Sequence, residues 1–525
     1  MKTILFNKRL FSVLKIHMMK KLIMLLFLGC SLIGFSQKLR FKVDGIKDTT
    51  VFLTKYYGSK LYYADTAIMK NGVAEFTATE SLKPGILALL MPGQKYFEFI
   101  YNNEEINIET KSPRFIDDMK IKKSEENKLF IGYIQFLQNQ RNNANEIKAK
   151  RDVIKGKDEV MEKMYDKQLD SISTGVTNYQ KSLIDNNKEK LVSKLLKMSM
   201  DITIPEPPKN DKGEAIDPDF RYHYFRAHYW DNVDLSDDRL VNTQVFGQKI
   251  EFYFGKNMLL QHPDTILKVA YQFCDRLKPS SEVFKFSVDY ITNNFAKSNI
   301  MGMDKVFVMM ADRYYCRTNP ETGKSYAYWM PKEKLDDLCK DNIVKKKLVQ
   351  GVVPPNVILR DTTDKNWRGF YDLKSEYTIL YFWDPECGHC KKITPKMQKL
   401  YAEKLKARNV EVFAVGKATG DDFEKWKKFI RDNKLTFINV GLTKSLYEEA
   451  VKDALPLMKY TNIESLNYHD TYDLYATPRI IVLDKDKKII AKQLTISQLE
   501  DLMDRLQNIK DAPILFPPDP EEEAH

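Results

Sequence analysis

The sequence FWDPECGHCKK, residues 382–392, decides the fold of the last third of this chain. It ends an apolar stretch, 378–383, that is typical of a buried strand, and it opens a stretch of helical character, 391–405. Cys387 and Cys390 therefore lie where a strand meets a helix. The free N–H groups and the positive dipole end at the start of a helix stabilise a thiolate. The thiolate is the form of cysteine that attacks a disulfide.

The two cysteines are expected to have different roles. Cys387 is the more exposed residue at the helix start, which predicts that it is the nucleophile and forms a mixed disulfide with a substrate. Cys390 follows one turn later and is near enough to resolve that intermediate. His389 lies between the two sulfurs, where a cationic imidazole would favour the thiolate and raise the reduction potential.

Other uses of such a pair fit the sequence less well. A structural zinc site needs four ligands, and only one close cysteine pair is present. A c-type haem requires His directly after the second cysteine, where Lys391 stands. A peroxidatic cysteine has Thr three positions before it, where Asp384 stands. A permanent structural bridge stays open as an alternative, although strained short-loop disulfides are usually catalytic. We therefore predict neither a metal nor a cofactor.

Strands and helices alternate around this motif, and a β-hairpin follows. The stretches expected as strands are 357–359, 378–383, 410–415, 479–483 and 488–490. Those expected as helices are 391–405, 421–433 and 497–506. This order predicts an α/β domain over residues 351–510.

The motif and this element order resemble the exported thioredoxin-like thiol–disulfide oxidoreductases of the TlpA/ResA kind. Pro395 stands where those proteins kink the active-site helix. Thr477-Pro478 precedes a strand, where the family has its cis-proline opposite the dithiol. The resemblance implies a thioredoxin fold and disulfide exchange. It also implies that Pro478 belongs to the catalytic site, and that Trp383, Thr477 and Pro478 bind substrate.

Two departures from the family pattern concern the proton of Cys390. Thioredoxins have a buried Asp six residues before the first cysteine, and here that residue is Tyr381. The exported reductases often carry a Glu shortly after the second cysteine, where this chain has Lys391-Lys392-Ile393. The proton acceptor of Cys390 is therefore unassigned. The segment between Leu442 and Thr477 is longer than a minimal thioredoxin needs, and we expect it to shape the substrate groove.

From residue 39 to 108, apolar and polar residues alternate between turn residues, which is typical of half-buried strands. This pattern predicts a small, β-sandwich-like all-β domain over residues 37–111. It resembles the small β-domain often found ahead of thioredoxin-like domains in envelope proteins of Bacteroidetes-type bacteria. The matching residues are Val43-x-Gly45, Tyr56-Tyr57-Gly58, Asp65-Thr66 and Asn71-Gly72-x-x-x-Phe76.

Residues 112–350 have sparse glycine and apolar residues at helical spacing, which predicts an all-α middle domain. Its architecture resembles the helical domain that often lies between the other two in those proteins. The aromatic run 220–230 is interpreted as a helix in the domain core, with a ligand or partner surface as the alternative. His223 and His228 are five residues apart and do not share the face that a helical metal site uses.

Both ends of the chain differ from its globular part. Lys20 and Lys21 precede the apolar stretch 22–33, and Gly34-Phe35-Ser36 resembles a cleavage site. Residues 1–36 therefore read as a signal peptide, which predicts a periplasmic or cell-envelope protein. A retained anchor, or a lipid on Cys30, stays open, and only these would place the protein at the membrane. At the other end, Pro and Glu are frequent, and we expect residues 511–525 to form a disordered acidic tail.

The charge distribution and the number of cysteines argue against two further classes of protein, nucleic-acid-binding proteins and disulfide-rich scaffolds. The formal net charge is +11, and six of the positive residues lie in the first 37 positions. The remainder is spread through sequence of mixed sign, so no nucleic-acid partner is expected. Cysteines are too few for a disulfide scaffold. Cys274, Cys316 and Cys339 are interpreted as buried thiols, with a Cys316–Cys339 bridge left open.

Two functions remain. In the first, the protein is a periplasmic thiol–disulfide oxidoreductase that exchanges disulfides with exported proteins, helped by an unidentified electron donor or acceptor. In the second, it is an envelope binding or assembly protein whose thioredoxin-like domain is regulatory or vestigial. The intact Cys387, Cys390 and Pro478 favour the first, since reactive cysteines occupy accessible, electropositive helix starts.

Overall fold

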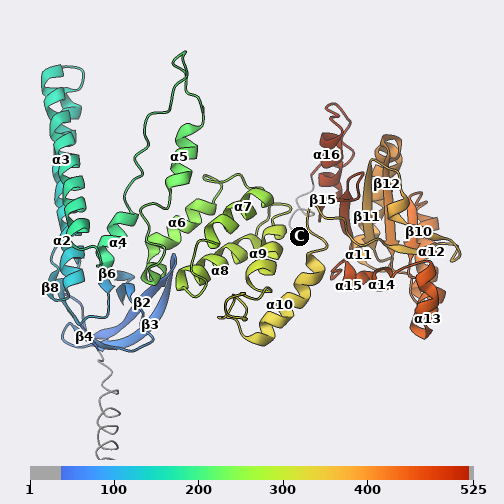
Figure 1. Cartoon of the computed structure of the whole chain (residues 1–525), viewed down its shortest axis with the longest axis horizontal. Coiled ribbons are helices and arrows are strands. Elements are labelled where there is room, and N and C mark those ends of the chain that lie inside the picture. Colours follow the sequence, from blue (N-terminus) through green and yellow to red (C-terminus); the bar gives the residue numbers. More distant parts are fainter. Residues whose placement is uncertain (1–36, 519–525) are drawn as a thin grey trace, which may run out of the picture. The chain divides into compact units, whose positions relative to one another are not determined.

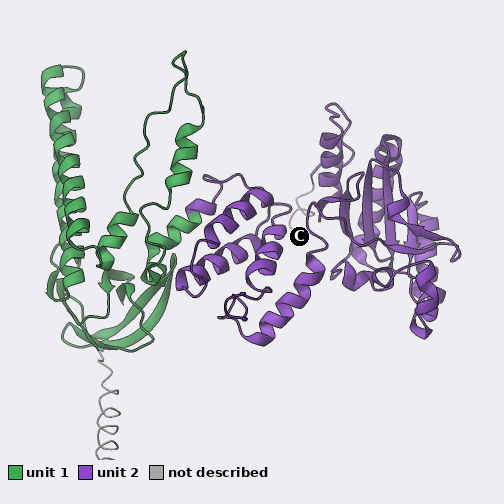
Figure 2. Ribbon diagram, in the orientation of Figure 1, with its two compact units in different colours: residues 1–251 green, residues 252–525 purple. Residues whose placement is uncertain are grey.

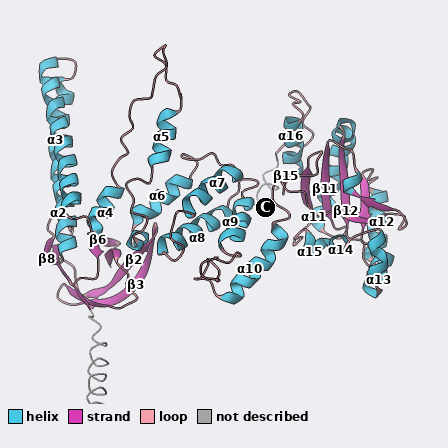
Figure 3. Ribbon diagram, viewed as in Figure 1, coloured by secondary structure: helices cyan, strands magenta, loops and turns pink. Residues whose placement is uncertain are grey.

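The structure is a computed structural model that describes residues 37–518. The chain divides into two compact units, residues 1–251 and 252–525 (Figure 2). The predicted signal peptide and residues 519–525 lie outside the described residues. Secondary structure changes along the chain from strands to helices and then to a mixed sheet with helices (Figure 3). The expected order of an all-β region, an all-α region and an α/β region is thus observed.

The first unit begins with two four-stranded sheets, in the orders β4-β1-β7-β8 and β3-β2-β5-β6. Apolar residues that alternate along the strands meet between the sheets, and the Phe41 and Phe99 rings lie 4.9 Å apart there. The expected boundary at residue 111 is too early, because β8 pairs with β7 and continues the first sheet. The strands are β1 Gln37–Asp44, β2 Thr49–Tyr57, β3 Lys60–Met69, β4 Val73–Ala78, β5 Gly85–Met91, β6 Lys95–Tyr101, β7 Ile106–Lys111 and β8 Lys120–Lys123.

A long helical hairpin follows in the same unit, formed by α2 (Glu125–Ile154) and α3 (Glu159–Asn186) (Figure 1). The buried carboxylate of Glu126 accepts hydrogen bonds from the first N–H groups of α4 (Leu191–Met198). Glu126 thereby fixes the base of the hairpin. Most of the aromatic run forms α5 (Phe220–His228), which has no buried residue, so the interpretation as a core helix is wrong for these residues. The last two aromatics of the run, Tyr229 and Trp230, are buried. The elements η1 (Asp238–Asn242) and α6 (Gln244–Phe254) come next.

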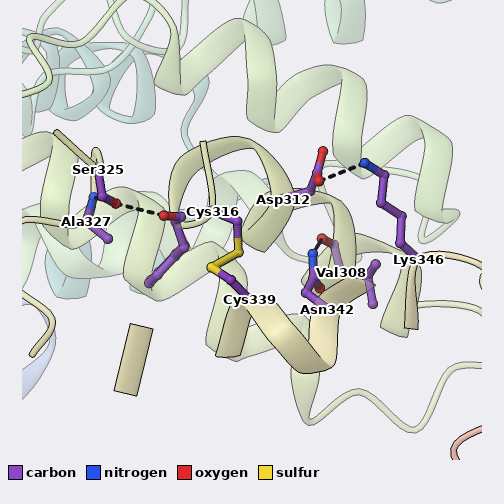
Figure 4. The surroundings of a disulfide bond; sticks show 9 residues. Val308, Asp312, Cys316, Ser325, Ala327, Cys339, Asn342 and Lys346 are labelled. Atoms are coloured by element: carbon purple, nitrogen blue, oxygen red, sulfur yellow. Dashed lines mark hydrogen bonds and ion pairs between the residues drawn. A yellow bond between two sulfur atoms is a disulfide. The ribbon is translucent and has the colours of Figure 1, made fainter. Parts of the chain in front are cut away.

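The second unit begins with four helices, α7 (Pro263–Cys274), α8 (Glu282–Ala296), α9 (Asp304–Tyr314) and α10 (Lys332–Lys345). Cys274 is a buried free thiol. Cys316 and Cys339 form a disulfide, so the interpretation of these two residues as thiols is wrong (Figure 4). Their Cα atoms lie 5.4 Å apart, because the chain after α9 returns to pack α10 beside that helix.

The rest of the second unit is a seven-stranded sheet in the order β10-β9-β13-β12-β11-β14-β15. The central strands β11, β12 and β13 are parallel, and β14 runs antiparallel to β11. Alternate residues of β11 face two separate apolar cores, one on each side of the sheet. The strands are β9 Ile358–Asp361, β10 Trp367–Gly369, β11 Tyr377–Trp383, β12 Val410–Gly416, β13 Ile438–Gly441, β14 Arg479–Leu483 and β15 Ile489–Lys492.

Helices cover both faces of this sheet. One core contains residues of α11 (Gly388–Leu400), α12 (Asp422–Asp432) and α16 (Ile496–Leu506). The other contains residues of α13 (Lys444–Lys452), α14 (Ile463–Leu466) and α15 (Tyr468–Thr471). Helices α13, α14 and α15 lie between Leu442 and Thr477, the segment that is longer than a minimal thioredoxin needs.

Part of the expected disordered tail is attached to this domain. The backbone N–H groups of Leu515 and Phe516 donate to the carboxylate of Glu500, and both side chains pack against the core under α16. Glu500 in turn pairs with the buried Lys404. The segment before residue 517 is therefore held by a buried acid.

Candidate active site

Cys387 is placed by the turn that joins β11 to α11. Asp384 shapes this turn, because its carboxylate accepts the N–H of Glu386 at 2.7 Å and its carbonyl accepts the N–H of Cys387 at 3.2 Å. Cys387 then occupies the N-cap position of α11, and no side chain caps the helix there. The first N–H groups of α11 are consequently free to interact with the sulfur.

The surroundings of Cys387 favour its thiolate. Burial raises the pKa of this half-buried thiol, but hydrogen bonds from the backbone N–H groups of Cys390 and His389 and an interaction with Thr477 outweigh that effect. The net result is a pKa below the ordinary value for cysteine. In the thiol form, the sulfur donates to the carbonyl oxygen of Thr477 at 3.4 Å.

Cys390 lies one turn further along α11 and has the opposite character. It is fully buried, and burial raises its pKa to about 12. Its sulfur accepts a hydrogen bond from the backbone N–H of Asp384 at 3.4 Å. Near neutral pH, Cys387 is therefore the more readily ionised thiol of the pair, and Cys390 stays protonated.

Thr477 and Pro478 lie opposite the dithiol, as the sequence predicts. They precede β14, the antiparallel neighbour of β11, and the peptide bond between them is cis. The carbonyl of Thr477 is the group that contacts Cys387. The ends of two adjacent strands thus bring together Cys387, Cys390, Thr477 and Pro478, which are separated by about 90 residues of sequence.

Trp383 and His389 are arranged differently from the expectation. The Trp383 side chain is 1% exposed, and its ring centroid lies 5.2 Å from that of Phe429 of α12, so the ring packs in the core instead of projecting to the surface. It faces the α11 core because it alternates along β11 with Phe382. The His389 side chain is exposed, and the effect of this residue on the pKa of Cys387 comes from its backbone N–H.

The sequence did not reveal the partner of Tyr381, which occupies the position of the family's buried acid. Its hydroxyl lies 2.8 Å from the Thr394 hydroxyl, and both residues are fully buried. Burial raises the pKa of Tyr381 well above its ordinary range, so this hydroxyl stays neutral. Thr394 is one turn after Cys390 on α11, a spacing that could have suggested the pair.

The described part of the chain shows neither a metal centre nor a membrane-spanning helix. No group of three or more His, Cys, Asp or Glu residues within positions 37–518 is arranged to hold a metal ion. Within the same residues, no helix is both long enough and apolar enough to cross a bilayer.

Three family models match separate parts of the chain. Residues 375–489 match the model described as thioredoxin-like. Residues 38–130 and 180–341 match two domains of unknown function, DUF4369 and DUF5106. No curated protein matches the chain.

Several solved structures are similar to part of the chain. A domain of a possible thiol-disulfide isomerase from Cytophaga hutchinsonii is 35% identical, covering 30% of this chain and 94% of that one, with a TM-score of 0.25. The thioredoxin domain of a thiol-disulfide oxidoreductase from Bacteroides vulgatus is 26% identical, covering 30% and 97%, with a TM-score of 0.24. A thioredoxin-like protein from Bacteroides caccae is 16% identical and covers 58% and 98%, with a TM-score of 0.36.

Proposed function

This chain belongs, through residues 375–489, to the thioredoxin-like family, and we propose that it exchanges disulfides with exported proteins in the periplasm or cell envelope. The observation that carries the proposal is the difference between the two sulfurs. Cys387 is accessible, has a lowered pKa and lies against Thr477, whereas Cys390 is buried with a pKa of about 12. A pair that differs in this way can attack in a defined order.

The exchange proceeds in two steps when the protein acts as a reductant. The Cys387 thiolate attacks one sulfur of a substrate disulfide, that bond breaks, and the departing substrate thiolate takes up a proton. Cys390 then loses its proton and attacks the Cys387 sulfur, which closes the Cys387–Cys390 disulfide and releases the second substrate thiolate. Two electrons pass to the substrate, and a dithiol donor must return them. The reverse sequence oxidises a substrate dithiol.

The Cys316–Cys339 disulfide supports the proposed compartment. Stable disulfides persist in exported proteins and are rare in the cytosol, where thiols are kept reduced. This bond lies in the helical region, away from the sequence that forms the dithiol. Together with the signal-like residues 1–36, it favours export, with membrane attachment only if that segment is retained or lipidated.

Trapping of covalent partners tests the proposal. The full chain carrying Cys390→Ala should accumulate mixed disulfides with exported proteins, because the resolving thiol is gone. These adducts should disappear on treatment with dithiothreitol. The matched control is the double variant Cys387→Ala/Cys390→Ala, which should form none of them.

Two outcomes would overturn the proposal. One is a wild-type protein that does not reduce a small disulfide, such as that of 2-mercaptoethanol. The other is equal trapping by Cys390→Ala and by the double variant. Either outcome would favour the alternative function, an envelope assembly protein whose dithiol is vestigial.

A further inference from the structure

A pocket of about 230 Å³ lies beside the dithiol, in the thioredoxin-like domain. Its walls include Phe382 at the end of β11, Val415 at the end of β12, and Leu474 and Thr477 from the loop before β14. Thr477 belongs both to the pocket wall and to the surroundings of the dithiol, since its carbonyl oxygen lies 3.4 Å from the Cys387 sulfur. A substrate cysteine bonded to Cys387 therefore has its neighbouring residues within reach of the pocket.

Tyr468 of α15 gives the pocket a polar group without a partner. Its side chain is 4% exposed, with its ring near those of Phe382 and His469. No residue among positions 37–518 hydrogen-bonds its hydroxyl. Burial, reinforced by the charge of Asp384, raises the pKa of this group, so it remains a neutral donor. Buried hydroxyl groups usually have a partner, and the pocket provides the space for one.

Two oppositely charged residues, Asp384 and Lys417, are among those that line the pocket. They pair with each other at 3.4 Å, and Lys417 also pairs with Asp422 at 3.0 Å. The paired charges of the lining therefore offer little to attract a charged side chain. Aromatic and aliphatic walls with one free hydroxyl suit an uncharged aromatic group.

We propose that this pocket binds an aromatic side chain of the substrate polypeptide, preferentially tyrosine, close to the cysteine that Cys387 attacks. The proposal rests on the proposed function and adds a substrate preference to it. The volume is below the roughly 300–1,000 Å³ of typical small-molecule sites, which favours one side chain as the occupant. Tyr475, 84% exposed at the rim, supplies a second aromatic surface for it.

The pocket also gives a role to the long segment after β13. Tyr468, His469 and Tyr475 all come from the stretch between Leu442 and Thr477, which exceeds a minimal thioredoxin. The segment forms α13 to α15 on the face of the sheet opposite α11 and then returns to β14. Tyr468 and Thr477, the residue before the cis-proline, thus line the same pocket.

Rates measured with matched peptides test this inference. Short peptides carry one cysteine as a mixed disulfide with 2-mercaptoethanol and differ only in the residue next to the cysteine, on either side. That residue is Tyr, Phe, Ala, Lys or Glu. The reduced full chain is mixed with each peptide, and the rate constant of a single turnover is measured. We expect the tyrosine peptide to react about tenfold faster than the alanine peptide at one of the two positions, a ratio typical of a filled apolar pocket.

Two variants connect this preference to the pocket. Tyr468→Phe should bring the Tyr-to-Phe rate ratio close to one and keep the preference for an aromatic residue over alanine. Tyr447→Phe is the matched control, because this tyrosine is 47% exposed on α13 and does not line the pocket. It should preserve the Tyr-to-Phe ratio. Tyr475→Ala, at a position too exposed to perturb folding, should lower the aromatic preference several-fold.

The possible outcomes distinguish failure of the pocket's proposed role from failure of the proposed disulfide exchange. Equal rates for all peptides, or a preference for the Lys or Glu peptide, would overturn the pocket's role while the exchange activity stands. An unchanged Tyr-to-Phe ratio in a folded Tyr468→Phe protein would do the same. Failure of the wild-type protein to reduce any peptide, or the disulfide of 2-mercaptoethanol itself, would instead overturn the proposed function.

Discussion

At the residue scale, Cys387 and Cys390 have the same side chain and acquire opposite properties from positions three residues apart. Cys387 receives the free N–H groups at the start of α11, which stabilise its negative charge. Cys390 lies under the turn, where its thiolate would be removed from water. The backbone path from β11 into α11 therefore determines which sulfur is more readily ionised. Of the two residues between the cysteines, His389 contributes through its backbone N–H group.

Alkylation as a function of pH tests this difference. In the reduced full chain, the rate of the iodoacetamide reaction of Cys387 should rise with pH, with its midpoint below the ordinary cysteine pKa of about 8.5. Cys390 should react only as the pH approaches 12, since deprotonation of its thiol requires that pH. Mass spectrometry of the two labelled sites after short pulses gives both profiles. Superimposable profiles would contradict the assignment of nucleophile and resolving thiol.

Sequence reasoning located this site but not all of its contacts. The positions of Cys387, Cys390 and Thr477-Pro478 follow from motif spacing and element order, because each stands at a strand end. The roles expected for Trp383 and His389 depend on side-chain direction, which spacing alone does not fix. The ring of Trp383 is directed to the core by β-strand alternation and by contact with α12. A residue adjacent to a motif therefore need not face the substrate.

At the element scale, one buried hydrogen bond joins the active-site helix to the central strand. Tyr381 of β11 and Thr394 of α11 contact each other inside the core, at the position where the family has an acid. A neutral hydroxyl pair replaces a group that could accept a proton. We expect this pair to hold α11 in register on β11.

A double-mutant cycle tests that role. Tyr381→Phe should leave the buried Thr394 hydroxyl without its partner, at a cost of about 1–3 kcal/mol in local stability. Tyr381→Phe combined with Thr394→Val should cost little more than the single change, because both partners are then apolar. Hydrogen exchange of the β11 and α11 amides in the full chain gives these free energies. Tyr377→Phe on the same strand is the control, and strictly additive costs would exclude a coupled pair.

The elements that the sequence predicted are those with strong local patterns. Strands β1 and β4 of the first region alternate clearly, and β11 and β12 are largely apolar. By contrast, β8 has the sequence KIKK, and its strand conformation depends on pairing with β7. The four-residue helices α14 and α15 are too short to show a helical period. These elements take their conformation from the surfaces they pack on.

At the scale of the whole molecule, the two disulfide-capable pairs of the second unit have different positions in their elements. The dithiol lies within one turn at the start of a helix, whereas Cys316 and Cys339 close a loop between two helices with a separation of 23 residues. The proximity of Cys316 and Cys339 could not be predicted from the sequence, because it depends on how α10 packs beside α9. The position of the dithiol therefore suits disulfide exchange, whereas the Cys316–Cys339 bond holds two helices together.

The Cys316–Cys339 bond is one of a small number of contacts that attach α10 to its surroundings. Asn342 is the one buried residue of this helix, and its side chain donates to the Val308 carbonyl at 3.1 Å (Figure 4). Lys346, just after the helix, pairs with Asp312 at 2.7 Å. Cys339, Asn342 and Lys346 thus attach one face of α10 to the α9 region through a covalent bond and polar contacts. With so little apolar burial, the bond should dominate the stability of this helix.

Replacing Cys316 and Cys339 by serine tests this expectation. Closing a loop of 23 residues is worth about 3 kcal/mol in the chain-entropy account. Amide exchange in α10 should therefore accelerate by roughly two orders of magnitude, while exchange in β11 and β12 stays unchanged. The comparison uses a background in which Cys387 and Cys390 are alanine, so that only this disulfide responds to reductant. In that background, dithiothreitol should accelerate α10 exchange to the level of the serine variant and leave the serine variant unaffected. Slow exchange in α10 without the bond would show that the polar contacts alone hold the helix.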